Sequence, residues 1–488
     1  MTIKTITMAT LLMAGSMAPG ITGLGTALGA DDQPMAVLRS QYFSAEDFIN
    51  RRHKLLAQLG DNDVVALLPS ELDLYSNDTD FPYHAEVHVL YLTGSNMEKT
   101  HLLMTKRGEK TSETLFTMKK DPHFETYMGR IPSATENTKM SGIKKVLLTP
   151  SFKANLSSAL SAIGPDGVLW LDLGNRRNME STYPETPANE LALEVKKNFP
   201  DITIKNLTPI LRELREVKSD NEVEALRRAS VISAKGHKAA MTRSLTATQE
   251  HQVEATLEFT FRDEGATGIG YPSIVGSHWN ATILHYGTNN DPIRRDGLML
   301  IDAAAEVEGY SADVTRTWPV DGTFSEAQAD IYSMVLEAQT ASMEASVKGN
   351  SYSDMVGKSY DVVSKGLLKL GLIAEEKYDQ VRLYYLHGIA HGIGLDVHDP
   401  LNNKKPLMVN QVYTIEPGVY VRKDIVEDSD VFKALTPAQQ KSISVALSKY
   451  NHIGVRIEDD IVITETGNEN LSKDAPRTIA EIEKHLKR

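Results

Sequence analysis

Two aspartates stand near the ends of neighbouring strand-like segments, where their carboxylates would suit a divalent cation. Asp302 ends an apolar run, and Asp313 follows eleven residues later in a second run. A turn centred between Val307 and Glu308 would place the two aspartates opposite each other, with Cβ atoms about 5 Å apart. Buried carboxylates at that separation repel each other unless a cation lies between them. Two solvated turn residues are the alternative, which the apolar run before Asp302 disfavours, and we therefore predict that this pair contributes to a metal site.

A histidine-rich segment at residues 387–399 adds imidazoles at His387, His391 and His398. Three histidines this close, in a chain with 14, are compatible with coincidence or surface polarity when taken alone. The spacing of the first two suits a zinc-binding helix, but no glutamate follows His387 and three glycines disfavour a helix. An imidazole beside carboxylates suits Mn, Co, Zn or Fe better than Ca or Mg.

Two glutamates, Glu416 and Glu458, lie in apolar, strand-like surroundings farther along the chain. Each alone is more often a salt-bridged strand residue, so the prediction depends on the whole set. That set has four carboxylates and one imidazole, from Asp302, Asp313, His391, Glu416 and Glu458. Its negative charge is too large for one divalent ion and suits two ions that share carboxylates and a water molecule.

The composition is that of a folded protein without cysteine chemistry. At 488 residues the chain is long enough for two domains, and its 41% hydrophobic and 24% charged residues are typical of soluble globular proteins. A net charge of −13 disfavours nucleic acids and anionic membranes as partners. The absence of cysteine excludes disulfides, thiolate metal sites and a cysteine nucleophile. Metal ligands must therefore be His, Asp or Glu.

The N-terminal segment 1–30 is typical of a secretory signal peptide. After one early lysine it has no charge until Asp31, and it contains an apolar run at 6–14. Small residues favour cleavage after Ala27 or Ala30. An uncleaved membrane anchor is the alternative, but a proline and five glycines interrupt the apolar run. We expect export to the periplasm or the cell exterior, without membrane attachment after processing.

The segment after this leader has the texture of an α/β domain. Short apolar runs at 63–69, 88–93 and 167–172 alternate with helical patterns, which indicates strands of a buried sheet. Ser219 and Glu222 then have capping-box spacing before a long amphipathic pattern. We therefore place the domain boundary near residue 217, with an N-terminal domain at 31–217 and a second domain at 218–488.

The second domain is predicted to be α+β. Its helical patterns lie at 219–244, 246–264, 325–347 and 352–371, and its strand-like runs lie at 297–302, 311–317, 411–416 and 455–464. Strand pairs bounded by turn residues favour antiparallel or mixed pairing over a doubly wound sheet.

An ordered series of motifs carries a family resemblance. It consists of Ile283-Leu284-His285-Tyr286, Asp302 with Asp313, the segment from His387 to Asp399, Glu416-Pro417-Gly418 and Arg456-Ile457-Glu458-Asp459-Asp460. This series resembles the metallopeptidases of the pita-bread (creatinase/aminopeptidase) fold, in particular aminopeptidase P and prolidase. The similarity covers the whole second domain and continues upstream, where residues 81–83 and 91–94 resemble the N-terminal domain of that family.

The resemblance implies a role for each candidate metal ligand. Asp302 would bind one metal ion and His391 the other, while Asp313 and Glu458 would bridge both. Glu416 would bind the second ion and also accept a proton from the attacking water, which makes it the catalytic base.

Further residues match positions around the metals in that family. His285 and His398 would hydrogen-bond the substrate or a developing oxyanion. Arg456 and Tyr420 would orient ligands, and His387 would line the pocket. The segment 422–452, with a helix predicted to open at Thr436, and the sequence Pro400-Leu401-Asn402-Asn403 depart from the family pattern.

The implied activity is removal of the N-terminal residue from peptides with proline in second position, by a metallo-aminopeptidase with two divalent ions. Manganese is expected, with zinc or cobalt as alternatives, in a homodimer or homotetramer. The main rival is a prolidase, which cleaves only Xaa-Pro dipeptides. A non-enzymatic peptide-binding module and a metal-free creatinase-like hydrolase are disfavoured by the complete ligand set, and a methionine aminopeptidase by the large upstream domain.

Overall fold

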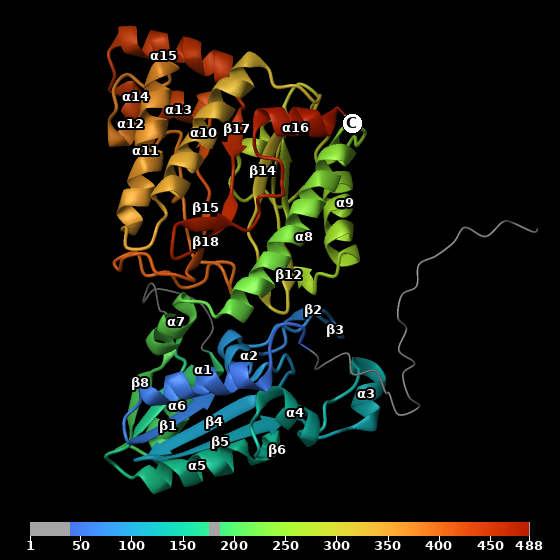
Figure 1. The fold of residues 1–488 in the computed structure, drawn as a ribbon, viewed down its shortest axis with the longest axis vertical. Coiled ribbons are helices and arrows are strands. Elements are labelled where there is room, and N and C mark those ends of the chain that lie inside the picture. The colour runs from blue at the N-terminus through green and yellow to red at the C-terminus, as the bar shows by residue number, and fades with distance from the viewer. Residues whose placement is uncertain (1–39, 175–185, 488) are drawn as a thin grey trace, which may run out of the picture.

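The computed structural model describes residues 40–174 and 186–487. The predicted signal peptide lies outside these residues. Figure 1 shows two parts stacked along the long axis, an N-terminal domain with elements up to α7 and a C-terminal domain from α8 onward. Among the described residues, no helix combines the length and the hydropathy that a membrane crossing requires.

The N-terminal domain is built on a mixed six-stranded sheet with the order β6-β5-β4-β1-β7-β8. Strands β1, β7 and β8 run parallel to one another, and the pairs β1–β4 and β4–β5 are antiparallel. The strands are β1 (Asn62–Leu67), β4 (His101–Arg107), β5 (Lys110–Thr117), β6 (Val146–Leu148), β7 (Val168–Leu171) and β8 (Thr203–Asn206), with a separate hairpin of β2 (Leu74–Ser76) and β3 (Thr79–Asp80). The predicted α/β texture and the strands near 63–69 and 167–172 are confirmed.

Hydrophobic clusters lie on both faces of this sheet and separate it from the helices. The helices are α1 (Ala45–Ala57), α2 (Val87–Thr93), α3 (Pro122–Met128), α4 (Ala134–Ser141), α5 (Phe152–Ile163), α6 (Pro187–Asn198) and α7 (Thr208–Glu216), with a 3₁₀ turn at Thr149–Ser151.

The strand predicted at 88–93 is wrong, because this segment forms helix α2. Glu86 caps the helix by accepting hydrogen bonds from the backbone N–H groups of His88 and Val89. Gly94 ends it in the left-handed conformation, with φ of 72°. A short apolar run that is buried against a sheet has no periodicity that separates a helix from a strand.

The C-terminal domain surrounds small antiparallel sheets with long helices, as α+β predicts. Its helices are α8 (Asp220–Ser244), α9 (Glu250–Asp263), α10 (Glu326–Ala345), α11 (Tyr352–Lys369), α12 (Tyr378–Val381), α13 (Lys423–Asp428), α14 (Asp430–Lys433), α15 (Pro437–Tyr450) and α16 (Ile479–Leu486), with a 3₁₀ turn at Asn280–Thr282. The predicted capping box of Ser219 and Glu222 opens α8, and Thr436 caps α15 as expected.

The sheets of this domain have the orders β10-β11-β14, β13-β12-β9, β15-β18-β19 and β16-β17. Every pairing within them is antiparallel. The strands are β9 (Gly268–Ile269), β10 (Ile274–Ser277), β11 (Leu298–Asp302), β12 (Ala305–Val307), β13 (Tyr310–Ser311), β14 (Thr315–Pro319), β15 (Val412–Ile415), β16 (Gly418–Tyr420), β17 (Gly454–Arg456), β18 (Asp459–Ile463) and β19 (Asn468–Asn470).

The predicted register of Asp302 against Asp313 is wrong by two residues. Asp302 pairs with Thr315, and the hairpin turns at Glu308 and Gly309. Both turn residues have positive φ, 52° and 87°, which suits a tight hairpin turn of the primed type. Asp313 instead lies between β13 and β14, so the predicted strand at 311–317 is two strands.

The polar insertion at 422–452 packs on the outer side of α10. Lys449 of α15 pairs with Asp330 at 3.1 Å and with Glu326 at 3.2 Å, and Tyr450 donates a hydrogen bond to Asp330 at 2.8 Å. Figure 1 places α13, α14 and α15 at the end of the molecule that faces away from the N-terminal domain.

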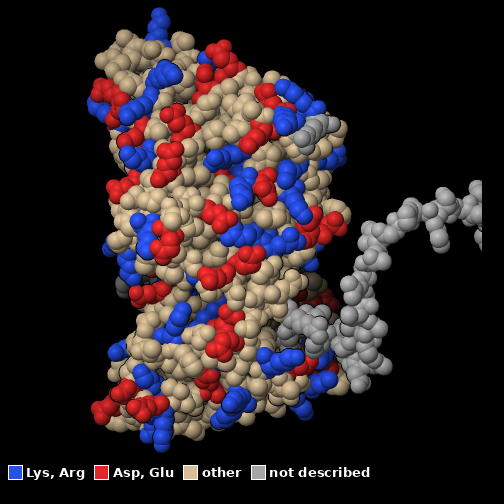
Figure 2. Space-filling model, viewed as in Figure 1, with Lys and Arg blue, Asp and Glu red and all other residues tan. Residues whose placement is uncertain are grey.

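Charged side chains are mixed over the face drawn in Figure 2. Lys and Arg residues alternate with Asp and Glu residues over both domains, so the net charge of −13 forms no single acidic patch on this face. Two of the predicted ligands, Asp313 and Glu458, are instead buried in the interior.

Candidate metal centre

The carboxylates of the candidate centre lie where strands end or change partners. Asp302 is the last residue of β11, and Asp313 separates β13 from β14. Glu416 lies between β15 and β16, and Glu458 lies between β17 and β18. The segment β15–β16 runs antiparallel to the segment β17–β18, since β15 pairs with β18 and β16 with β17. The break in each segment contains one of the two glutamates, so the glutamates lie beside each other.

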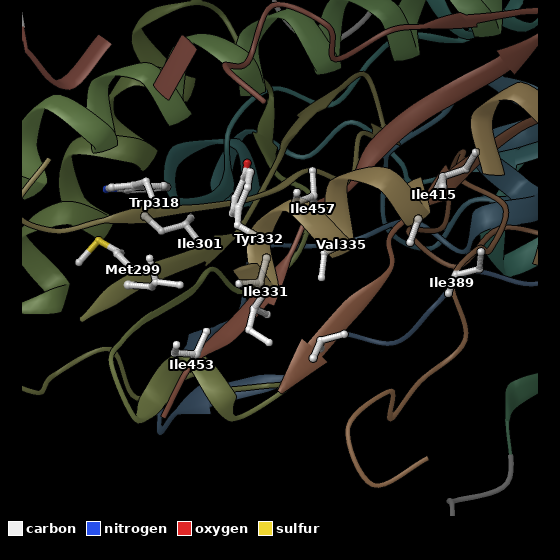
Figure 3. Close-up of a cluster of buried hydrophobic side chains, with 14 of the residues drawn as sticks. Met299, Ile301, Trp318, Ile331, Tyr332, Val335, Ile389, Ile415, Ile453 and Ile457 are labelled. Carbon is white, nitrogen blue, oxygen red and sulfur yellow. The ribbon is translucent and has the colours of Figure 1, made fainter. Parts of the chain in front are cut away.

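Side-chain alternation explains why these carboxylates face the centre. The residue before Asp302, Glu416 or Glu458 is an isoleucine, and Figure 3 shows that all three isoleucines belong to one buried hydrophobic cluster. Successive side chains of a strand point to opposite faces. Packing of these isoleucines into the core therefore directs the carboxylates to the other side.

Two hydrogen bonds to Thr414 of β15, one of them to its side chain, hold His391 at the centre. The His391 N–H donates to Thr414 Oγ1 at 3.2 Å, and the Thr414 N–H donates to the His391 carbonyl at 2.9 Å. The imidazole Nε2 then lies 3.4 Å from both Asp313 Oδ2 and Glu416 Oε1. Ligand atoms of Asp313, His391 and Glu458 lie within 4.8 Å of one another. The structure thus brings the predicted ligands together.

The centre contains more carboxylate oxygens than donors. The Tyr271 hydroxyl is within hydrogen-bonding distance of both Asp302 Oδ1 and Asp313 Oδ1, although it has one proton to donate. Glu458 Oε2 accepts a hydrogen bond from Thr315 at 2.6 Å. Tyr271 was not predicted, and its sequence context gives no motif that would have identified it.

Burial of this acidic set has a large electrostatic cost. Burial, followed by repulsion from Asp302, raises the pKa of Asp313 well above its usual range. The pKa of Glu458 is raised in the same way by burial and by Asp313, and burial raises the pKa of Glu416 to about 8. Buried carboxylates with too few donors are stabilised by cations. The donor set therefore fits divalent metal ions.

The histidines of the centre are kept neutral. Burial lowers the pKa of both His387 and His391 to about 4, so each ring has an unprotonated nitrogen at neutral pH. A neutral imidazole is the form that binds a metal ion.

Arg456 and Tyr420 lie behind the carboxylates, as the resemblance implies. Arg456 donates to Asp302 Oδ2 at 2.6 Å and to the Tyr420 hydroxyl at 2.8 Å. His387 Nε2 lies 2.9 Å from the same hydroxyl, and His387 Nδ1 lies 3.5 Å from Glu416 Oε2. His387 is thus joined to the centre more closely than a pocket-lining role requires.

His398 lies against the ligand set, whereas His285 is placed only by its exposure and by its neighbours in the chain. The His398 ring stacks on the His391 ring, with centroids 3.8 Å apart and planes at 16°. His398 is exposed, and so is His285, which follows the 3₁₀ turn at 280–282. Both rings are therefore accessible to solvent, and of the two, the described residues give a contact with the ligand set for His398 alone.

Gln339 holds the two strand breaks together from α10. Its side-chain amide donates to the carbonyl oxygens of Ile415 at 3.0 Å and Ile457 at 3.1 Å, directly before the two glutamates. The side chain is fully buried. Sequence reasoning missed it because a glutamine within an amphipathic helix carries no local sign of a distant partner.

Comparison with known proteins supports this arrangement. The profile of metallopeptidase family M24 matches residues 224–465, and that of the aminopeptidase P N-terminal domain matches residues 48–166. The Xaa-Pro aminopeptidase of Haemophilus influenzae is 32% identical over 90% of this chain and 96% of its own length. The chain belongs to metallopeptidase family M24. Its two-domain arrangement places it with the aminopeptidase P members.

Solved structures of M24 members have the same fold. Aminopeptidase P from Escherichia coli with the inhibitor Pro-Leu is 30% identical, has a TM-score of 0.78 and covers 91% of this chain and 98% of its own. A zinc-substituted form of that protein in complex with product is 31% identical, again with a TM-score of 0.78 and the same coverage of both chains. The predicted pita-bread fold is therefore confirmed, and so is a metal-dependent hydrolase of the aminopeptidase type.

Proposed function

We propose that this M24 protein removes the N-terminal residue from peptides that have proline in second position. The observation that carries the proposal is that one largely buried cluster, with more carboxylate oxygens than hydrogen-bond donors, contains Asp302, Asp313, His391, Glu416 and Glu458. Relatives that are named Xaa-Pro aminopeptidases cover nearly the whole chain, which favours this activity over the prolidase alternative.

The acidic set would hold two divalent ions, as assigned above: Asp302 on one, His391 and Glu416 on the other, with Asp313 and Glu458 shared. When bound, the ions supply a water of lowered pKa as nucleophile near neutral pH.

Proton transfer is assigned to Glu416. Its Oε1 lies 3.4 Å from His391 Nε2 within the ligand set, so the carboxylate is within reach of a water held by the same ions. It can accept the proton of the nucleophile and return it to the leaving nitrogen. The proton is required because the prolyl nitrogen leaves as a neutral amine and not as an amide anion.

The exposed histidines are assigned to substrate contacts. His398, stacked on His391, and His285 would hydrogen-bond the peptide and the oxyanion that develops on its carbonyl. Arg456 keeps Asp302 and Tyr420 in place through its two hydrogen bonds, and His387 orients Tyr420.

A peptide-length panel tests the activity. We expect release of glycine from Gly-Pro-Pro and from longer Gly-Pro peptides, and none from matched peptides with alanine in second position. Cleavage of the Gly-Pro dipeptide alone would move the protein to the prolidase function. Full activity after exhaustive chelation would contradict the metal-dependent mechanism.

Manganese is the proposed native metal. Four carboxylates and a single imidazole form an oxygen-rich donor set that suits Mn better than Zn, while the imidazole disfavours Ca. Chelated protein would be reloaded with Mn, Zn, Co or Ca, and bound metal, melting temperature and turnover would be measured. Stronger binding and higher turnover with Zn would contradict this choice.

We further propose that the mature chain starts between Leu28 and Asp31, acts outside the cytoplasm and forms a homodimer or homotetramer. The proposed domain boundary stays near residue 217. N-terminal sequencing of protein from its native host and light scattering would test the first and the last of these features. A retained leader or a stable monomer would contradict them.

A further inference from the structure

The segment between the two domains contacts the loop that carries two histidines of the metal centre. Arg215 at the end of α7 forms an ion pair with Asp399, and Lys218 contacts the other oxygen of that carboxylate at 2.9 Å. The side chains of Arg215, Lys218 and Asp399 are only 3%, 1% and 1% exposed. Asp399 directly follows His398 in the chain.

Asp399 also closes the loop on itself. Its N–H donates to the Gly392 carbonyl at 2.7 Å, next to His391, and its Oδ1 accepts from the Asp396 N–H at 3.2 Å. A Cβ at Gly392 would lie 2.6 Å from the Asp399 carbonyl oxygen, so the approach at this point requires glycine. The position of Asp399 therefore determines how His391 and His398 are held relative to each other.

Arg215 is itself attached to the N-terminal domain. Its Nη1 donates to His88 Nε2 at 3.0 Å, and His88 Nδ1 contacts Asp172 at the end of β7 and Glu86 of the α2 cap. These three residues are close enough to hold a metal ion, but the Arg215 guanidinium on the fourth side disfavours a cation there. The cluster instead holds the His88 ring against the Arg215 guanidinium.

The next residue strengthens the same connection. Glu216 Oε1 accepts from the Asn402 N–H at 2.9 Å and from Gln411 Nε2 at 2.9 Å, so the far end of the loop is also held by this segment. We call Arg215, Glu216 and Lys218 the interdomain clamp. Figure 1 places α7, which carries the first two, between the sheet of the N-terminal domain and the base of the C-terminal domain.

We propose that Arg215 is a positioning residue for the reaction: it transmits the orientation of the N-terminal domain, through Asp399, to the paired rings of His391 and His398. The N-terminal domain thereby takes part in preorganising the centre rather than only covering it. The effect on turnover rests on the proposed function, whereas the effect on the loop does not.

The decisive comparison is Arg215→Met against Arg51→Met. Arg51 is also a buried cation between the domains, but its polar contacts are with Glu222 at 3.5 Å, the Tyr310 hydroxyl at 3.1 Å and the Tyr91 carbonyl at 2.9 Å, not with residues 391–399. We expect R215M to lower kcat by about 10²-fold with KM little changed, since small displacements of catalytic groups have effects of that size. R51M should lower the melting temperature while keeping most of the turnover.

Hydrogen–deuterium exchange of the metal-free proteins supplies a readout that is independent of activity. R215M should exchange faster than wild type and R51M over residues 391–400, and Arg215→Lys, which restores the charge, should recover part of both effects. Equal exchange in this segment for R215M and R51M overturns the proposal, whatever the turnover. If R215M does not fold, Asp399→Asn is compared with R51M instead, again by kcat and by the exchange rate of residues 391–400, with the same expected differences.

Failure of the proposed function is distinguishable from failure of this inference. If the wild-type protein releases nothing from Xaa-Pro peptides, turnover cannot be compared between the variants. Hydrogen–deuterium exchange over residues 391–400 still decides whether the interdomain clamp holds the loop. If wild type is active and R215M keeps wild-type kcat and exchange, the clamp alone is wrong.

Discussion

Asp302 ends a strand and the other three carboxylates of the metal centre lie in short breaks between consecutive strands, whereas its histidines lie in longer segments without a named strand. Asp302 and the two glutamates are aimed by alternation against core isoleucines. His391 and His398 depend instead on a loop that is closed by Asp399 and held by residues of the other domain.

The two groups of side chains are therefore held in position in different ways. A strand register is fixed by many hydrogen bonds, so one substitution far away moves a strand-borne ligand little. The position of an imidazole on a loop is fixed by the few contacts that anchor that loop. Substitutions at the carboxylates should therefore abolish metal binding or chemistry directly, while substitutions at the loop anchors should lower turnover and keep the metal.

The largest effect is expected for Glu416→Gln. The amide keeps the shape of the side chain but cannot accept and return a proton, so turnover should fall by about 10²–10⁴-fold. The core around Ile415 is untouched, and the melting temperature of the metal-free protein should not fall. Steady-state kinetics at saturating metal, with Glu427→Gln on α13 as control, would check this. Near-normal turnover in a metal-replete variant would contradict the role of Glu416.

Much of the strand-borne half of the centre was predictable from sequence. Each of Asp302, Glu416 and Glu458 follows an isoleucine in an apolar run, and such a run predicts a buried strand, so a carboxylate at its end is expected to be buried as well. The helix starts at Ser219 and Thr436 were predictable too, because a capping box is a local signal.

The remaining features depend on contacts between distant residues. The register of Asp302 was wrong because the turn is set by positive φ at Glu308, which its residue type does not reveal. Gln339 and Arg215 have partners more than 70 residues away, so no sequence window contains both sides of the interaction. Loop anchors are thus the part of such a site that sequence reasoning finds last.

A second, smaller contrast compares Asp313→Asn with His398→Ala. Asp313 is assigned as a bridging ligand, so its loss should weaken metal binding by more than about 10²-fold, beyond the range seen for groups that only orient ligands. His398→Ala should keep the metal and lower kcat by about 10²-fold through loss of oxyanion contacts. Metal analysis after dialysis against a weak chelator would measure the difference. Equal metal content in both variants would contradict the bridging assignment.

The strand-borne carboxylates also predict how stability depends on pH in the metal-free protein. Burial raises the pKa of Glu416 from 4.5 to about 8, so between these values the folded state binds more protons than the unfolded state. This carboxyl therefore lowers stability as pH rises from about 4.5 to about 8, with a slope of up to about 1.4 kcal/mol per pH unit for each such group. Asp313 and Glu458, whose pKa values are also raised, add to the same slope. Because the lowered pKa values of His387 and His391 give the opposite slope between about 4 and 6.5, the net fall in stability is expected above pH 6.5.

Urea unfolding of chelated protein at a series of pH values would measure this slope. Bound metal compensates the carboxylates, so metal-saturated protein should show a much flatter profile. In the chelated state Asp313→Asn should raise stability near pH 8, because it removes one repelling charge, whereas at saturating metal the same substitution should lower it. The same sign in both states would contradict the electrostatic account.

The smallest effect on turnover is expected for Glu250, which anchors the segment 277–291 that contains His285. Glu250, fully buried at the start of α9, accepts from the Ser277 N–H at 2.7 Å, the Tyr286 hydroxyl at 2.8 Å and the Asp291 N–H at 3.1 Å. Glu250→Gln keeps the shape but turns an NH₂ group toward some of these donors. We expect a loss of about 1–3 kcal/mol in the free energy of unfolding, the usual cost of a buried mismatch. Because His285 directly precedes Tyr286, kcat/KM should also fall, by less than for R215M.

Glu258→Gln, two turns farther along α9, is the matched control for both measurements. Equal stability and equal kcat/KM for the two variants would show that Glu250 does not hold this loop, and the contrast between strand-borne and loop-borne groups would then hold for His391 and His398 alone.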